Sequence, residues 1–249
     1  MLKEERFEII LTQLKEKTKV TFEELALNLH ISEDTVRRDI EVLHRNGLLS
    51  KVRGGAILRE KDPLSFHDRQ SFSADEKNVI ALKVQPFIKN GMTVFMDGGT
   101  TICAVANYMA PTINLRIITN NMSLIPVLSK FKNVELVVLG GNYDGNLSVT
   151  EGLTTCRQAS QYVADLFIMG TCAVDAGFGA SATSVTDAET KRTMIQSSKK
   201  IIALADQNKL RRTEPFKICD VSDIHILITD LPADDLELKS LRKSDIQIV

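Results

Sequence analysis

The chain has 249 residues, and its 31 Lys and Arg residues almost balance its 32 Asp and Glu residues, which leaves a formal net charge of −1. This balance excludes a general electrostatic attraction of the whole chain to nucleic acid or to membrane surfaces. The length suits a small module followed by a larger domain better than one hydrophobic core. No apolar run approaches the roughly 20 residues that a membrane-spanning helix needs, so we expect no membrane partner.

The N-terminus and the cysteines indicate a reducing compartment. Met1-Leu2-Lys3-Glu4-Glu5 is charged and lacks the apolar core of a secretory signal, so we expect a cytoplasmic protein. The 4 cysteines are scattered, with neither a C-x-x-C spacing nor a histidine at metal-binding distance. We therefore expect reduced thiols, no metal site and no cofactor.

Two helices are predicted in the first thirty or so positions. Residues 4–17 carry apolar residues at helical spacing, which is typical of an amphipathic helix. That apolar stripe consists of Phe7, Ile10, Leu11 and Leu14. Thr21 and Glu24 have the spacing of a capping box, in which each side chain binds the backbone N–H of the other residue. A short second helix should follow and bury Leu25 and Leu29.

A third helix is predicted after a turn at His30-Ile31. Ser32 is a favourable N-cap, because its hydroxyl can accept from the unpaired N–H groups of the first turn. The buried face of the helix is formed by Val36, Ile40 and Leu43. The opposite face carries Ser32, Thr35, Arg38 and Glu41, with Arg37 near its edge. Short hydroxyls and guanidinium groups at this end of a helix are suited to base edges and phosphates in the DNA major groove.

Two short strands are predicted next, over residues 48–52 and 56–58, and Arg53-Gly54-Gly55 joins them. Asn46-Gly47 should end the preceding helix, since Gly accepts the left-handed conformation. Residues 1–58 are thus predicted to form an α+β winged helix-turn-helix DNA-binding domain. Because this segment is nearly balanced in charge, the interpretation depends on the order of the elements. The expected DNA-binding residues are Thr21, Ser32, Thr35, Arg37, Arg38, Lys51, Arg53 and Gly54.

These motifs carry a family resemblance. The runs Val36-Arg37-Arg38-Asp39-Ile40, Gly47-Leu48-Leu49 and Arg53-Gly54-Gly55-Ala56, with Leu43 between the first two, resemble the N-terminal signature of the DeoR/GlpR family of bacterial transcriptional regulators. The later motifs extend the resemblance along nearly the whole chain. It implies a winged helix-turn-helix fused to a sugar-phosphate-sensing domain, and it implies repression of a carbohydrate operon.

Residues 59–73 are predicted as a linker, because Lys61-Asp62-Pro63 interrupts the periodicity. Residues 74–249 then alternate between helix and strand, which is typical of an α/β Rossmann-like domain with a mostly parallel sheet and helices on both faces. The predicted strands are 93–96, 115–118, 134–139, 166–169, 200–204 and 224–228. The predicted helices are 76–89, 101–109, 123–130, 153–163 and 189–197. This domain is expected to bind the effector and to form the oligomer.

Four of these strands end in small or polar residues. Ligands of parallel sheets bind at the carboxyl ends of strands, beside helix N-termini, so these ends should line one site. Asp97-Gly98-Gly99-Thr100-Thr101 suits a phosphate best, because glycines let the backbone approach and a helix start offers unpaired N–H groups. The expected effector-binding residues are Asp97, Gly98, Gly99, Thr100, Thr101, Thr119, Asn120, Gly140, Gly141 and Lys209, with Lys209 supplying a cation.

The second domain also resembles ribose-5-phosphate isomerases and their relatives. In this resemblance Asp97 to Thr101 take the place of the isomerase phosphate loop. The isomerases carry an Asp-Gly-Ala-Asp-Glu run with catalytic carboxylates, where this chain has Met169, Cys172 and Ala173. Enolisation needs a positioned base, and neither Met nor Ala can serve as one. We therefore expect no catalytic residue, and a domain that binds a sugar phosphate without turning it over.

The sequence thus predicts a regulator that binds double-stranded operator DNA as a homodimer or homotetramer. The family resemblance implies that it represses a carbohydrate-metabolism operon, while the residues themselves leave repression and activation open. A phosphorylated sugar is the expected effector, and its identity is left open. A sugar-phosphate isomerase or deaminase with an appended DNA-binding module is the alternative. A structural or RNA-binding protein is a third interpretation, which the scarcity of aromatic residues and the absence of Trp disfavour.

Overall fold

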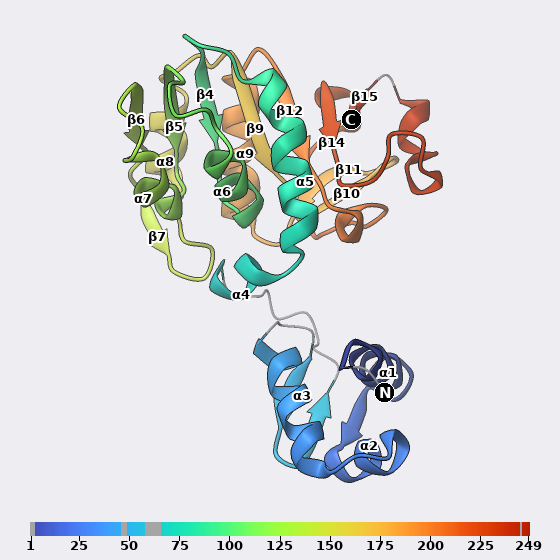
Figure 1. Ribbon diagram of the computed structural model, residues 1–249. Helices are drawn as coiled ribbons and strands as arrows, with labels where there is room; N and C mark the ends of the chain where they lie inside the picture. The colour runs from blue at the N-terminus through green and yellow to red at the C-terminus, as the bar shows by residue number, and fades with distance from the viewer. Residues whose placement is uncertain (1–2, 46–48, 58–65, 245) are drawn as a thin grey trace. The chain divides into compact units, whose positions relative to one another are not determined.

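The computed structural model describes residues 3–45, 49–57, 66–244 and 246–249. The chain divides into two compact units, Met1–Phe72 and Ser73–Val249, and each is described by itself (Figure 1). The helix end predicted at Asn46-Gly47 lies outside the described residues, as do residue 48 of the first predicted strand and residue 58 of the second. The expected linker is only partly described, and helix α4 (Phe66–Ser71) falls within it. Over the described ranges, no helix combines the length and apolarity that crossing a membrane requires.

The first unit is a helical module with a small antiparallel sheet. Its first three helices are α1 (Lys3–Lys17), α2 (Phe22–Leu29) and α3 (Glu33–Arg45). Its strands are β1 (Lys19–Thr21), β2 (Ser50–Val52) and β3 (Gly55–Ile57), in the order β1-β3-β2. The core contains the predicted apolar positions Ile10, Leu14, Leu25, Leu29, Val36, Ile40 and Leu43. The winged helix-turn-helix prediction is therefore confirmed.

Strand β1 was not predicted, and it extends the wing hairpin to three strands. Val20 is buried in the core, and Thr21 pairs with Gly55 of β3. A β-carbon at Gly55 would come 2.1 Å from the Val20 carbonyl oxygen, so only Gly allows this close approach. The close pairing attaches the base of the wing to the segment that begins α2.

The second unit contains a seven-stranded sheet in the order β15-β14-β12-β9-β4-β5-β6, and all neighbouring strands are parallel. The strands are β4 (Thr93–Met96), β5 (Leu115–Thr119), β6 (Val134–Val138), β9 (Leu166–Gly170), β12 (Ile201–Leu204), β14 (Ile226–Ile228) and β15 (Gln247–Ile248). Six of the seven were predicted. The seventh, β15, has only two residues, which is too short for a periodic pattern to predict.

Helices cover both faces of this sheet, as predicted. They are α5 (Ala74–Val84), α6 (Thr100–Asn107), α7 (Ile125–Leu128), α8 (Leu153–Ala159) and α9 (Val185–Gln196). Figure 1 shows α5 and α6 in front of the sheet and α9 behind it. Right-handed crossovers produce this division, because the chain moves from β4 towards β5 and β6, and later from β9 in the opposite direction to β12.

Two smaller antiparallel sheets were not predicted. One pairs β7 (Asn142–Asp144) with β8 (Val149–Glu151), and the other has the order β10-β11-β13. The second consists of β10 (Ala173–Asp175), β11 (Gly179–Ala182) and β13 (Phe216–Cys219). Strand β11 reads Gly-Ala-Ser-Ala and is buried throughout. It lacks the β-branched and aromatic residues by which a strand is predicted from sequence.

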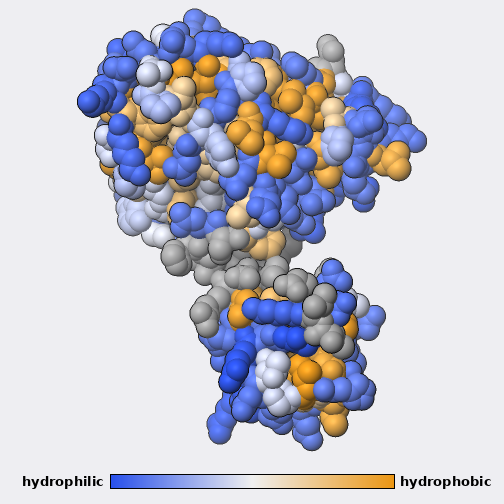
Figure 2. All heavy atoms as spheres, viewed as in Figure 1, coloured by the Kyte–Doolittle hydropathy of each residue, from blue (hydrophilic) through white to orange (hydrophobic). Residues whose placement is uncertain are grey.

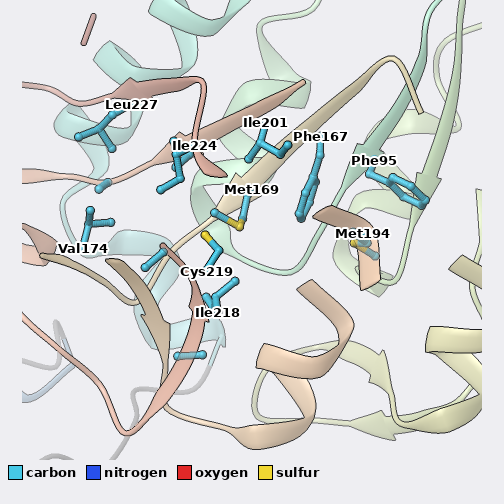
Figure 3. Packing of buried hydrophobic residues seen from close by; sticks show 14 of the residues in the cluster. Phe95, Phe167, Met169, Val174, Met194, Ile201, Ile218, Cys219, Ile224 and Leu227 are labelled. Carbon is cyan, nitrogen blue, oxygen red and sulfur yellow. The ribbon is translucent and has the colours of Figure 1, made fainter. Parts of the chain in front are cut away.

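The main core of the second unit lies between the sheet, α9 and the small β10-β11-β13 sheet (Figure 3). Phe95 of β4 and Phe167 of β9 belong to this core and meet edge to face, with ring centroids 6.2 Å apart. Met169 and Ala173, which take the acidic positions of the isomerases, are fully buried members of this core. On the outer side, Val79 and Leu82 of α5 are exposed, and Figure 2 shows apolar atoms gathered over this face.

Candidate functional site

Local hydrogen bonds fix the start of α2 and the turn between α2 and α3. Thr21 and Glu24 form the predicted capping box, in which the Glu24 N–H donates to Thr21 Oγ1 and the Thr21 N–H donates to Glu24 Oε2, both over 3.1 Å. His30 ends α2 in the left-handed conformation, with a φ of 53°. The Thr35 N–H donates to Ser32 Oγ over 3.3 Å, so Ser32 caps α3 as predicted. The capping box thus defines where α2 begins, and His30 and Ser32 define where α2 ends and α3 begins.

Helix α3 is attached to α1 by an ion pair as well as by apolar contacts. Arg6 Nε lies 2.6 Å from Asp39 Oδ2, and Arg6 Nη2 donates to Asp39 Oδ1 over 3.1 Å. Two parallel bonds of this kind give a defined geometry, which a single ammonium contact does not. Since Asp39 is buried, the pair fixes the rotation of α3 about its axis and so determines which residues face solvent.

The predicted DNA-binding cations differ in how they are engaged. Arg37 Nη2 lies 3.0 Å from Glu33 Oε2, and the Arg37 guanidinium lies 4.5 Å from the centre of the Phe22 ring. Lys51 pairs with Glu41 of α3. Arg38 and Arg53 are exposed and form no hydrogen bond or ion pair within the described part of the chain. Of the four predicted DNA-binding cations, Arg38 on α3 and Arg53 on the wing are thus the two that no described residue engages.

The remaining predicted DNA-binding residues shape the backbone. The Thr21 hydroxyl is engaged in the capping box, and the Ser32 and Thr35 hydroxyls lie 3.0 Å apart. Gly54 has a φ of 88° at the tip of the wing, a conformation that L side chains rarely adopt. These residues therefore position α3 and the wing. The unengaged positive charges of the two elements are those of Arg38 and Arg53 among the predicted DNA-binding residues.

In the second unit, the predicted effector residues lie where parallel strands end. Asp97 follows β4, Gly99 has a φ of 129°, and α6 begins at Thr100. The Asn121 side-chain nitrogen donates to the Asp97 carbonyl over 3.1 Å and to the Gly99 carbonyl over 3.4 Å. This amide, which is completely buried, fixes the loop in front of α6. The first N–H groups of α6 have no partner within the helix and are available to an anion.

The centre of this site is a buried cluster of charges that the sequence analysis missed. Lys191 Nζ lies 3.1 Å from Asp97 Oδ2, and it also forms an ion pair with Asp187 one turn earlier in α9. The Gly170 N–H donates to Asp97 Oδ1 over 2.8 Å. The cluster lies between β4 and β9, the point at which the chain reverses its direction across the sheet, where ligands of such folds bind.

Burial and the neighbouring charges shift the pKa values of Asp97 and Lys191 in opposite directions. Burial raises the pKa of Asp97 from its ordinary 3.8 to about 6, although the Lys191 ammonium opposes the shift. Burial lowers the pKa of Lys191, but Asp187 and Asp97 together reverse this and keep the ammonium protonated. One buried ammonium therefore faces two carboxylates, and the cluster has an excess negative charge when all three groups are ionised.

The other predicted effector residues have mixed surroundings. Thr119 Oγ1 donates to the Met96 carbonyl, and the Gly140 N–H donates to Gln158 Oε1 over 2.6 Å. A β-carbon at Gly141 would come 2.1 Å from Thr155 Oγ1, so this glycine allows the close approach of α8. Asn120 is buried and its side-chain nitrogen donates to the Thr150 carbonyl over 2.8 Å. Thr119, Gly140 and Gly141 thus make or allow contacts that hold neighbouring segments together, and Asn120 joins the end of β5 to β8.

Lys209 lies at the same edge of the sheet, but farther along it. It follows β12, and β9 separates this strand from β4, so strand spacing alone puts it roughly 10 Å from the Asp97 strand. Lys209 Nζ lies 3.4 Å from Asp206 Oδ2 and is partly exposed. The adjacent Asn208 amide donates to Ser73 Oγ over 3.4 Å, at the first residue of the second unit.

Lys191 and Asp187 were missed because an Asp and a Lys four residues apart on a helix usually form a solvated pair. Their burial depends on α9 packing across the ends of β4 and β9, which the local sequence does not reveal. Among the described residues, no group of three His, Cys, Asp or Glu side chains could hold a metal ion. A hollow of about 450 Å³ lies elsewhere, beside Ala176 and Val221, and it contains none of the predicted residues.

Comparisons with known proteins agree with this organisation. Residues 6–62 match the DeoR-like helix-turn-helix domain, and residues 73–231 match the DeoR C terminal sensor domain. The HTH-type transcriptional repressor GlcR of Bacillus subtilis is 32% identical over 92% of this chain and 89% of its own. The glycerol-3-phosphate regulon repressor of Escherichia coli is 29% identical over 100% of this chain and 99% of its own.

The second unit also has a limited similarity to solved structures. Ribose 5-phosphate isomerase A of Methanocaldococcus jannaschii is 14% identical, with a TM-score of 0.41, over 55% of this chain and 54% of its own. A similarity this partial carries no argument about the site. Both family matches and the relatives extend over the two units in the same order, and the chain therefore belongs to the DeoR family of transcriptional regulators.

Proposed function

We propose that the protein is a sequence-specific transcriptional repressor of a carbohydrate-metabolism operon and that a phosphorylated sugar releases it from its operator. The observation that supports the proposal is that each of the two units has its own group of residues suited to binding a partner. The first unit presents the unengaged Arg38 and Arg53, and the second has a strand-end site with the buried Lys191 at its centre. The relatives from Bacillus subtilis and Escherichia coli are repressors by name.

The DNA partner is a double-stranded operator with a partly palindromic sequence. In a homodimer or homotetramer, two copies of α3 would enter successive major grooves about 34 Å apart. Arg38 would read a base edge, and Arg53 of the wing would contact a phosphate. The site of action for such a protein is the cytoplasm.

The phosphate of the effector would bind at the Asp97–Thr101 loop, where the start of α6 offers unpaired N–H groups, with Lys209 as a second source of positive charge. Ligand binding would change the arrangement of the two units and so the spacing of the two α3 helices. A coupling of about 1–3 kcal/mol would alter operator affinity by roughly 5- to 150-fold.

The enzyme alternative has less support. Met169 and Ala173 are buried apolar residues in the core, so they offer no base. Asp97 and Asp187 do bring carboxylates to the site, but Lys191 binds both, and the Gly170 N–H takes the second oxygen of Asp97. A general base must be free to reach the proton that it removes. The arrangement therefore favours binding over turnover.

The test is binding of the full chain to DNA from upstream of its own gene and the neighbouring genes, with and without sugar phosphates. The salt concentration must be fixed, because phosphate contacts make DNA affinity steeply salt-dependent. Release of the DNA by one sugar phosphate, and not by the free sugar, is the expected result. Binding that no sugar phosphate alters would contradict the effector assignment. Consumption of a sugar phosphate without any DNA binding would favour the enzyme.

A further inference from the structure

Three buried oxygen atoms at the strand-end site accept no hydrogen bond from any described residue: Asp97 Oδ2, Asn120 Oδ1 and Glu151 Oε2. Asp97 Oδ2 has the Lys191 ammonium beside it, so its charge is compensated. The other two oxygens have no such partner. Buried acceptors without donors are rare, because each loses the hydrogen bonds that water would give it. Asn120 and Glu151 therefore need an explanation that the fold alone does not provide.

The orientation of the Asn120 amide is fixed by its surroundings. Its side-chain nitrogen donates to the backbone carbonyl of Thr150 over 2.8 Å. In return, the Thr150 N–H donates to the backbone carbonyl of Asn120 over 2.8 Å. A rotated amide would place two acceptors face to face at Thr150, so the oxygen must be the free atom. Asn120 is only 2% exposed, and the nitrogen of its side-chain amide contacts the carbonyl of the peptide bond that joins Thr150 to Glu151.

The Glu151 side chain lies on the side of β8 that faces the loop Asp97–Thr101. Side chains alternate along a strand, so Glu151 points to the same side as Val149 and opposite to Thr150. Val149 packs on the loop, since a β-carbon at Gly98 would come 2.5 Å from Val149 Cγ1. Thr150 instead donates its hydroxyl to the Leu139 carbonyl over 2.6 Å. The Glu151 carboxylate and the Asn120 oxygen therefore belong to the same edge of the site as Gly98 and Gly99.

We infer that Asn120 and Glu151 accept hydrogen bonds from adjacent hydroxyl groups of the effector, and that Glu151 determines which polyhydroxylated phosphate the protein recognises. This inference rests on the proposed function and names the ligand class of that site. A free carboxylate repels a phosphate dianion but is a strong acceptor for hydroxyl groups. The phosphate therefore binds the N–H groups at the start of α6, and the hydroxylated carbon chain extends towards β8.

The test uses the full chain and measures binding by calorimetry for ribose 5-phosphate, glucose 6-phosphate, fructose 6-phosphate and inorganic phosphate. Glu151→Gln keeps the shape of the side chain and removes its charge. Glu135→Gln is the matched control, because Glu135 is an exposed carboxylate on the edge strand β6 that pairs only with exposed Arg116 among the described residues. Release of operator DNA by the same compounds is measured in parallel.

The expected result is that at least one sugar phosphate binds more tightly than inorganic phosphate. Glu151→Gln should lower the affinity for this sugar phosphate about tenfold or more. Inorganic phosphate should bind the variant at least as tightly as the wild type, because a repulsive charge is removed, and this binding shows that the variant is folded. Glu135→Gln should change the affinity for neither ligand. Unchanged sugar-phosphate affinity in Glu151→Gln, with operator release intact, would overturn the inference and leave the proposed function standing. If none of the three sugar phosphates binds or releases the operator, the proposed function fails and this inference fails with it.

Discussion

Lys191 Nζ lies 3.1 Å from Asp97 Oδ2 and joins helix α9 to the end of strand β4. Strand β4 lies at the point where the chain reverses the direction in which it adds strands to the sheet. Lys191 is 3% exposed and Asp97 is 1% exposed, so solvent screens this pair very little. The same ammonium pairs with Asp187. The site that the sequence predicts for the effector is therefore built on a shared buried cation, and its stability and its response to pH depend on that cation.

Replacing Lys191 with Met should destabilise the second unit strongly. The substitution leaves two buried carboxylates without a counter-charge, and breaking a buried pair in this way costs about 3–5 kcal/mol. Lys199→Met is the matched control, because Lys199 pairs with Asp165 at the surface, and such pairs contribute at most about 1 kcal/mol. Thermal unfolding of the full chain measures both effects. Equal midpoints for the two variants would show that the buried cluster does not hold α9 in place.

The pH dependence of stability should reveal Asp97. Its pKa in the folded protein, about 6, lies above the ordinary 3.8, so the folded state holds this proton more tightly than the unfolded state does. Ionisation of Asp97 therefore lowers stability by an amount that grows between about pH 4 and pH 6 and is constant at higher pH, so the loss shrinks as the pH falls below 6. Between pH 7 and pH 5 the wild type should gain about 1 kcal/mol relative to Asp97→Asn.

Asp165 provides the control of opposite sign. The Lys199 ammonium and the Thr93 N–H hold the pKa of Asp165 below its ordinary value. Its contribution is therefore present above pH 4 and is lost only at lower pH, so wild type and Asp165→Asn should keep a constant difference between pH 7 and pH 5. Calorimetry of the full chain is suited to this comparison, because the two units can unfold in separate transitions. A wild type that loses stability relative to Asp97→Asn over this range would contradict the assignment.

The periodic elements of the fold were predictable because their burial follows from local pattern. Strand β4 has the predicted bounds, and most of the parallel strands agree to within a residue or two, since a strand covered on both faces appears as a short apolar run. Strand β11 could not be predicted, because its small residues gain their β conformation only from pairing with β10 and β13. Strand β1 is a similar case, since its pairing with β3 depends on close contact at Gly55.

The sequence could predict that several strand ends lie together, but not which residues of other elements pack against them. Parallel strands carry their ends to one edge, so the residues after β4, β5 and β6 had to lie together. Lys191 and Glu151 come from α9 and β8, whose approach to that edge is decided by tertiary packing. Burial is what distinguishes Lys191 from an ordinary helical lysine, and no local pattern encodes burial of a charged residue.

Arg38→Ala should weaken operator binding by about 1–3 kcal/mol and relax the sequence preference at one position, because Arg38 is expected to contact a base edge. Arg53→Ala should weaken binding to all sequences alike and reduce the salt dependence by about one charge, because a wing residue contacts phosphate. Both side chains are unengaged within the described residues, so neither change should alter the fold of the first unit. Titration of operator variants at several salt concentrations separates the two roles. An unaltered sequence preference in Arg38→Ala would contradict its assignment.

Lys209→Ala should raise the concentration of sugar phosphate that releases the operator by about tenfold or more, because a charge-assisted contact to phosphate is lost. DNA binding without effector should not change, since Lys209 belongs to the second unit and pairs only with Asp206 among the described residues. Lys239→Ala, at an exposed lysine of the same unit, is the control. Release measured by fluorescence anisotropy of labelled operator gives both quantities. If Lys209→Ala responds to the effector as the wild type does, Lys209 does not supply the cation for the phosphate.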